Sequence, residues 1–278
     1  MRKNQLDSGH NCFPWDPPDK REIGIALEGA YVIALKTLGQ KWVERNIAPT
    51  PGQNKSDFMK RGLGLEQDRL IHVDRVIYLA EFLDRLANVK NFTSKLKDLK
   101  TKSLEETFFE LQVAASLHSQ SLLLEFVVPK NVKGKDYDLI ASINGATIPV
   151  EVKCRTAETS FKENMLKNPL KHAARVQLPQ EGPNVIFYKI PAAWLNESDF
   201  VCRAEAALQK FLRDYTRINA VVLCWDEWVK PAAPTARLRR SKIFVNPKPR
   251  RMIEGIERIM RDQGILYTYR NRLGISFM

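Results

Sequence analysis

Residues 135–154 read KDYDLIASINGATIPVEVKC, and this stretch decides the fold. Two runs rich in aliphatic and β-branched side chains flank the dipeptide Asn144-Gly145. Asn-Gly in that setting is the strongest short-range signal of a β-hairpin with a two-residue turn. We therefore predict one strand over residues 137–143, a second over 147–154, and a tight turn between them.

The turn also determines which residues face each other across the hairpin. If Ile143 pairs with Ala146, then Asp138, five residues before Ile143, pairs with Glu151, five residues after Ala146. Directly opposed residues have Cβ atoms roughly 4.5–5.5 Å apart, so two carboxylates placed there repel each other. A divalent cation between them removes the repulsion, and carboxylate oxygens suit Mg²⁺ or Mn²⁺. Lys153 shares the face of Glu151 because strand side chains alternate, whereas in the competing interpretation this is only the charged, solvent-facing side of an ordinary hairpin.

A helix that precedes the hairpin contributes a third acid. Ser103 and Glu106 have the spacing of a capping box, and we predict that this helix runs over residues 103–119. Glu110 shares a helical face with three apolar residues at offsets of three, four and seven, namely Val113, Ala114 and Leu117. A carboxylate on that face is costly to bury unless it is paired or binds a metal ion. Glu110 is therefore the candidate third ligand, and the alternative is a glutamate at the edge of the apolar stripe that reaches solvent.

Hydrophobic periodicity along the rest of the chain predicts an alternation of helices and strands. We expect helices over about 20–45, 68–89, 103–119, 160–176 and 198–215, and strands over about 122–128, 137–143, 147–154, 185–190 and 220–225. This order indicates an α/β fold in which helices flank a central mixed β-sheet. We expect residues 1–102 to form a helical N-terminal region that acts as a scaffold, with a lysine-rich connector over 95–102, and residues 103–278 to form the second domain.

The chain is basic, with 44 Lys and Arg against 32 Asp and Glu and a formal net charge of +12. A surplus of this size favours a polyanionic partner, most simply nucleic acid. Residues 230–251 contain no Asp or Glu and include Arg237, Arg239, Arg240 and Lys242. Prolines in this segment predict a loop or arm, the start of a basic C-terminal extension over about 230–278. Such an arm either contacts phosphates or is merely solvated.

The sequence gives no support for a membrane span, a signal peptide or a cysteine zinc site. No apolar run approaches the roughly 20 residues of a membrane span, and the N-terminus lacks the apolar segment of a signal peptide. The four cysteines are scattered without zinc-like spacing, which is typical of free thiols in a reducing compartment; they are Cys12, Cys154, Cys202 and Cys224. We therefore predict a cytoplasmic location and no membrane partner.

The strand segments YDLIA (137–141) and VEVK (150–153), with the preceding helix that carries Glu110, resemble the metal-binding core of the PD-(D/E)XK nuclease superfamily. That superfamily includes restriction endonucleases and Holliday junction resolvases. The resemblance covers about residues 103–225 and implies a restriction endonuclease-like fold. It also implies that Asp138 and Glu151 hold the metal ion and that Glu110 joins the metal shell directly or through water. Lys153 would orient or activate the attacking water and stabilise the developing charge.

The chain departs from the family pattern at two places. Tyr137, in place of proline, precedes Asp138, a position that varies within the family. The helicase-associated branch has a glutamine followed four residues later by tyrosine, whereas Gln177 is followed at that offset by Glu181. That branch is therefore not supported, although Gln177 and Arg175 remain candidates for contact with nucleic acid.

The leading hypothesis is a Mg²⁺-dependent deoxyribonuclease, with DNA ahead of RNA as the substrate and Mn²⁺ as an alternative metal. The second hypothesis is a nucleic-acid-binding module that keeps the nuclease fold without catalysis. The third is an interaction protein that acts through the helical N-terminal region. Under each of them the chain could act as a homodimer.

Overall fold

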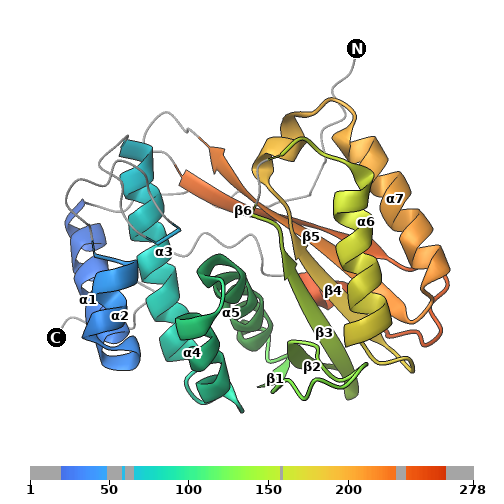
Figure 1. Cartoon of the computed structure of the whole chain (residues 1–278), viewed down its shortest axis with the longest axis horizontal. Helices are drawn as coiled ribbons and strands as arrows, with labels where there is room; N and C mark the ends of the chain where they lie inside the picture. The colour runs from blue at the N-terminus through green and yellow to red at the C-terminus, as the bar shows by residue number, and fades with distance from the viewer. Residues whose placement is uncertain (1–19, 49–57, 60–65, 157–158, 230–235, 261–278) are drawn as a thin grey trace.

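A six-stranded sheet lies at the centre of the computed structural model, which describes residues 20–48, 58–59, 66–156, 159–229 and 236–260 (Figure 1). The strands neighbour one another in chain order: β1 (Leu123–Phe126), β2 (Leu139–Ile143), β3 (Ala146–Cys154), β4 (Asn184–Lys189), β5 (Ile218–Val229) and β6 (Ala236–Val245). Strands β1, β2 and β3 pair antiparallel, β3, β4 and β5 pair parallel, and β6 returns antiparallel to β5. The expected α/β class and mixed sheet are confirmed.

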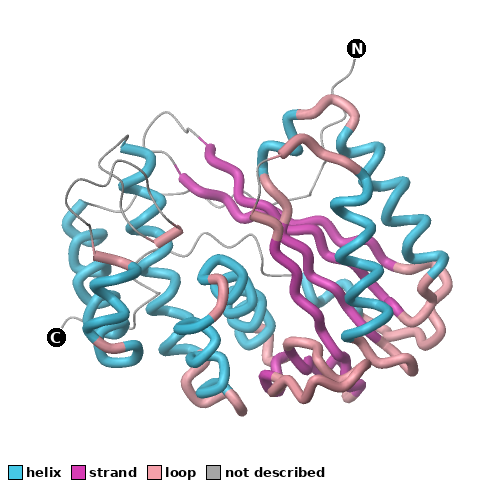
Figure 2. Tube along the Cα trace, in the orientation of Figure 1, coloured by secondary structure: helices cyan, strands magenta, loops and turns pink. Residues whose placement is uncertain are grey.

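Helices cover both faces of this sheet. They are α1 (Lys20–Leu38), α2 (Gln40–Asn46), α3 (Glu66–Arg85), α4 (Phe92–Thr101), α5 (Leu104–Ser119), α6 (Glu163–His172) and α7 (Phe200–Asp214). The π-helix η1 (Ala173–Gln177) continues α6, and two short 3₁₀ helices are η2 (Ala192–Asn196) and η3 (Ile256–Met260). Figures 1 and 2 show the sheet between α1–α5 on one side and α6 and α7 on the other.

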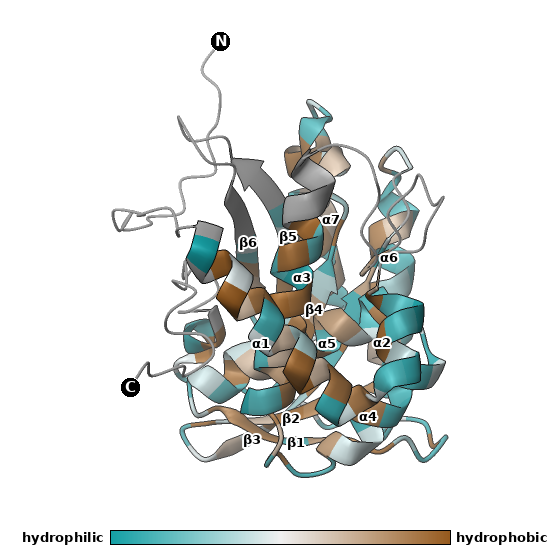
Figure 3. Cartoon of the chain, turned by 90° about the vertical axis from the view of Figure 1, so that its left-hand side faces the viewer, coloured by the Kyte–Doolittle hydropathy of each residue, from teal (hydrophilic) through white to brown (hydrophobic). Residues whose placement is uncertain are grey.

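Successive side chains of the central strands point to opposite faces of the sheet, so each helical layer packs on a different set of apolar residues. Val150 and Val152 of β3 belong to the core shared with α1–α5, whereas Ile186 and Tyr188 of β4 belong to the core under α6 and α7. The first core is continuous from Ala26 of α1 to the sheet, so the N-terminal helices and the sheet bury apolar surface together. Figure 3 looks onto the α1–α5 side, where the helices carry both apolar and polar residues.

Two of the expected N-terminal elements differ in the structure. The helix predicted over 20–45 is divided into α1 and α2 at Gly39, whose φ of 89° lies in the left-handed region that glycine adopts without strain. The predicted connector over 95–102 is wrong, because most of it belongs to α4. Phe92, Lys95 and Leu99 form the buried face of α4, so apolar contacts stabilise a helix in a segment where lysines dominate the composition.

The prediction of a loop or arm over 230–251 is wrong for residues 236–245, and residues 230–235 and 261–278 of the predicted C-terminal extension lie outside the described residues. Residues 236–245 form β6, which pairs with β5 from Val229↔Ala236 to Ala220↔Val245. The sheet order places β6 at an edge, and an edge strand tolerates charged side chains because one side of it is not covered by a further strand. The prolines and arginines of this segment do not indicate a strand, because the strand forms only by pairing with β5.

The membrane and cysteine predictions can be followed over part of the chain. None of the helices within the described ranges is long and apolar enough to cross a membrane. Cys154 and Cys202 are free thiols, Cys224 is buried in β5, and Cys12 lies outside the described residues. The cytoplasmic location stays a prediction.

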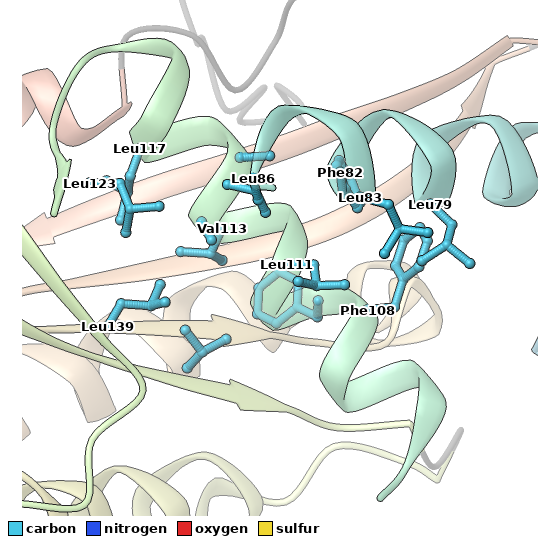
Figure 4. Close-up of a cluster of buried hydrophobic side chains, with 14 of the residues drawn as sticks. Leu79, Phe82, Leu83, Leu86, Phe108, Leu111, Val113, Leu117, Leu123 and Leu139 are labelled. Carbon is cyan, nitrogen blue, oxygen red and sulfur yellow. The ribbon is translucent and has the colours of Figure 1, made fainter. Parts of the chain in front are cut away.

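We expect the replacement Phe108→Ala to destabilise the whole chain by about 3–5 kcal/mol, because it removes a large buried side chain and leaves a cavity. The Phe108 ring of α5 packs with its centroid 5.2 Å from that of Phe58 and 5.3 Å from that of Phe82 in α3. Figure 4 shows Phe108 beside Phe82 and Leu79 between the two helices. Denaturant unfolding followed by circular dichroism should remain a single transition with a lower midpoint. Separate transitions for the N-terminal helices and the sheet would contradict a shared core.

Candidate active site

The β2–β3 hairpin has the register expected from its turn. Five residue pairs join the strands, from Ile143↔Ala146 to Leu139↔Val150. Asn144 and Gly145 have φ values of 50° and 80°, which suit the two central positions of a tight hairpin turn. The hairpin therefore brings the residue before β2, Asp138, next to the part of β3 that carries Glu151.

Asp138 is held at this position by two hydrogen bonds to β3. Its backbone N–H donates to the Val150 carbonyl at 3.1 Å, and its carboxylate Oδ2 accepts from the backbone N–H of Val152 at 2.8 Å. The backbone groups on either side of Glu151 thus fix the Asp138 carboxylate against the same short segment of β3. This contact is more specific than the general proximity expected from the register alone.

Glu151 is completely buried, and only one of its two carboxylate oxygens has a partner. Oε1 accepts a hydrogen bond from the Lys153 ammonium, whereas Oε2 is buried without a hydrogen-bond partner. Burial first, and then the negative charge of Asp138, raise the pKa of Glu151 well above its usual value, while Lys153 lowers it in part. A buried carboxylate oxygen without a donor is costly to the fold and chemically able to bind a cation.

Glu110 of α5 belongs to the same electrostatic environment. Burial and the negative charge of Asp138 raise the pKa of Glu110 to about 7, and the ion pair with Lys95 opposes this rise. The charge of Glu110 also contributes to the raised pKa of Glu151. Ser103 begins α5 as expected, since its side chain accepts a hydrogen bond from the Glu106 N–H at 3.5 Å. The charges of Glu110, Asp138, Glu151 and Lys153 therefore influence one another, while the metal-binding role expected for these residues stays a prediction.

Lys95 of α4 is a member of this cluster that the sequence analysis missed. Its ammonium is buried and forms ion pairs with Glu110 and, at 3.1 Å, with Asp98. Burial opposes the charged form of Lys95, but Glu110 and Asp138 outweigh that effect and raise its pKa. The available signal was the apolar spacing of Phe92, Leu96 and Leu99, which predicts a helix. We name Lys95, Glu110, Asp138, Glu151 and Lys153 the carboxylate–lysine cluster.

The carboxylates of the cluster could act as ligands of a hard divalent cation, but in this structure Glu110 and Glu151 form ion pairs with lysines. Among the described residues, no group of three or more His, Cys, Asp or Glu side chains is arranged to hold a metal ion. Lys95 and Lys153 neutralise Glu110 and Glu151, and the buried Oε2 of Glu151 lacks any donor. Carboxylate oxygens are of the ligand type that Mg²⁺ and Mn²⁺ prefer, so these residues fit such a cation by donor type, while Glu110 and Glu151 are each paired with a lysine.

The predicted nucleic-acid contacts divide into two places. Arg175 is exposed on η1, and Gln177 is half-buried nearby with its side-chain oxygen lacking a hydrogen-bond partner. Lys242 of β6 forms an ion pair with Glu205 of α7, which gives it a structural partner. Arg240 also lies on β6, as do Arg237 and Arg239, whose side chains lie outside the described part of the structure.

The ion pair between Lys95 and Glu110 can be tested by a double-mutant cycle in EDTA. Replacing Lys95 alone (Lys95→Met) leaves the carboxylates without their buried counter-charge, and we expect a loss of about 3 kcal/mol in the free energy of unfolding. The double variant Lys95→Met/Glu110→Met, which replaces both charges by side chains of similar length, should lose less than Lys95→Met does. Urea denaturation gives the free energy of unfolding of the wild-type protein, of the single variants Lys95→Met and Glu110→Met, and of the double variant. Strictly additive losses would show that the two charges do not stabilise each other.

Comparisons with known proteins identify no relative of this chain. No family model, no curated protein and no solved structure matches the chain.

Proposed function

We propose that the chain is a metal-dependent nuclease that hydrolyses phosphodiester bonds in DNA, with a restriction endonuclease-like fold. The observation that carries this proposal is the carboxylate–lysine cluster, in which Asp138 and the buried Glu151 adjoin across one hairpin with Lys153 beside them. A purely structural hairpin gains nothing from placing the charge of Asp138 where it raises the pKa of Glu151. The same arrangement is useful where a divalent cation has to be held next to a phosphate.

Each residue of the cluster has a distinct part in this proposal. Asp138 and Glu151 would hold Mg²⁺ or Mn²⁺, and Glu110 would bind it directly or through water. The bound cation would supply an activated water and polarise the phosphoryl oxygen. Lys153, whose ammonium is held by Glu151, would turn toward the phosphate, orient the attacking water and stabilise the developing negative charge.

Lys95 would act as a placeholder for positive charge. In the present arrangement it neutralises Glu110 and interacts with Asp138, so the acids can be buried without a metal ion. With a cation held by the acids, the Lys95 ammonium would supply positive charge for contact with the substrate phosphate. The N-terminal helices would then serve catalysis as well as stability, since Lys95 belongs to α4.

A second function has one observation in its favour. Lys95 and Lys153 together already neutralise Glu110 and Glu151, which would also suit a module that binds nucleic acid without cutting it. The unpartnered Oε2 of Glu151 favours the enzyme, because a binding module has no use for a buried acceptor without a donor. An interaction protein, a homodimer and RNA as substrate remain the further alternatives.

Cleavage assays on plasmid, linear and branched DNA, with RNA in parallel, test the proposal directly. We expect cleavage in Mg²⁺ or Mn²⁺ and none in EDTA. The variants Glu151→Gln and Lys153→Met should each lose activity by at least about 100-fold, the usual effect of removing a charge-stabilising group from an active site. Glu163→Gln is the matched control, because Glu163 is an exposed glutamate that also pairs with a lysine, Lys167. DNA binding without cleavage under every metal condition would favour the binding module.

Metal binding can be measured apart from activity. Mn²⁺ or Mg²⁺ should raise the thermal midpoint of the wild-type protein and of Glu163→Gln, since a ligand that binds only the folded state stabilises it. The rise should be absent from Glu151→Gln, which replaces the buried carboxylate by a neutral side chain of the same shape. An equal rise in Glu151→Gln would remove Glu151 from the proposed metal site.

A further inference from the structure

A second cluster of charged residues lines a cavity of about 360 Å³ outside the carboxylate–lysine cluster. The cavity lies where α7 ends and β5 begins, close to η1. Its walls include four basic side chains, one acidic side chain and one aromatic ring: Lys133, Arg175, Arg217, Arg250, Asp214 and Tyr215. We name this cavity the basic pocket. Its volume is many times the roughly 30 Å³ that one water molecule occupies in the liquid, so it can admit a group of several atoms.

Two arginines of the basic pocket are fixed on the same support. Arg217 donates from Nη1 to the side-chain oxygen of Gln180 and from Nη2 to the carbonyl of Ala174. Arg250 donates from Nη1 to the backbone carbonyl of Gln180 at 3.1 Å, and its backbone N–H donates to the Thr216 carbonyl at 2.7 Å. The two guanidinium groups are thus held near each other by neutral oxygens.

The basic pocket has an excess of positive charge that the described residues do not neutralise. Within the described ranges, no carboxylate forms an ion pair with Arg175, Arg217 or Arg250, although Asp214 lines the same cavity. Burial first, and then the positive charge of Arg250, lower the pKa of Arg217. Two arginines that repel each other, with no acidic partner, would be stabilised by an anion placed between them.

Phosphate is the anion that this arrangement fits best. Arginine presents a planar fork of N–H donors that matches phosphate oxygens, and three arginines line the basic pocket. Tyr215 stacks on Phe211 with the ring centroids 4.8 Å apart, and the Arg175 guanidinium carbon lies 5.9 Å from the Tyr215 centroid, so the ring supports Arg175 at the cavity. We propose that the basic pocket is a phosphate-binding subsite that holds a phosphate group of a nucleic-acid strand.

The inference rests on the proposed nuclease function, because the basic pocket would bind the substrate strand at a second place besides the carboxylate–lysine cluster. Lys133 of the basic pocket and Asp138 of the carboxylate–lysine cluster belong to one loop and are five residues apart, a span of at most about 17 Å. The loop is tied to η1 by a 2.7 Å hydrogen bond from the Gly134 N–H to the Val176 carbonyl. A phosphate in the basic pocket would therefore hold the strand beside the same loop that leads to Asp138.

Fluorescence anisotropy in EDTA tests the subsite without any cleavage. The probes are 3′-labelled single-stranded DNA oligonucleotides with either a 5′ phosphate or a 5′ hydroxyl. The variant Arg175→Gln/Arg250→Gln removes two exposed charges of the basic pocket, and we expect its affinity to fall at least about tenfold. The matched control Lys36→Gln/Lys41→Gln removes two exposed charges from α1 and α2, on the other side of the sheet, and should change affinity by less than about twofold (Figure 1).

The two probes identify the source of the phosphate. A loss confined to the 5′-phosphorylated probe assigns the subsite to a terminal phosphate, and an equal loss for both probes assigns it to an internal phosphate of the strand. An affinity no lower than that of the control variant, or no binding by the wild-type protein, overturns the inference. The nuclease proposal fails separately: binding that depends on the basic pocket, without metal-dependent cleavage, would leave the subsite in place and remove the enzyme.

Discussion

The interaction on which the rest of the structure depends is the repulsion among buried carboxylates at the β2–β3 hairpin. Glu151 lies completely inside the protein, and the charges of Asp138 and Glu110 add to the cost of ionising it. Lys153 offsets that cost from the same strand, and Lys95 of α4 pairs with Glu110. A fold that keeps such a cluster must either gain function from it or carry its cost for nothing, and the unpartnered oxygen of Glu151 favours function.

The need for a second lysine explains why the N-terminal helices pack where they do. Helix α4 places Lys95 against Glu110, and α5 carries Glu110 on a face that otherwise consists of apolar residues. Apolar contacts between α3 and α5, such as that of Phe82 with Phe108, hold this layer together. The region expected as a separate scaffold therefore completes the cluster electrostatically and shares its core with the sheet.

Sequence reasoning succeeded where the determining interactions are local. The Asn144-Gly145 turn dictates the hairpin register within a few residues, and the capping residue Ser103 marks the start of α5. It failed where a distant partner decides the outcome. Residues 236–245 become a strand only because β5 extends to Val229, and Lys95 becomes buried only because Glu110 lies opposite, which lysine-rich composition conceals. The basic pocket is likewise assembled from the β1–β2 loop, η1 and the chain after β6, so no single segment reveals it.

The net charge of +12 is not spread evenly, because the carboxylate–lysine cluster and the basic pocket differ in their balance of acidic and basic residues. In the carboxylate–lysine cluster, two lysines partly balance the negative charge of the acids. The three arginines that line the basic pocket have no acidic partner within the described ranges. A polyanion would be drawn toward the second place and repelled by excess carboxylate charge at the first unless a cation were bound there. The loop that ends at Asp138 joins the two places, so a strand held by its phosphate in the proposed subsite would lie beside the loop that carries Asp138.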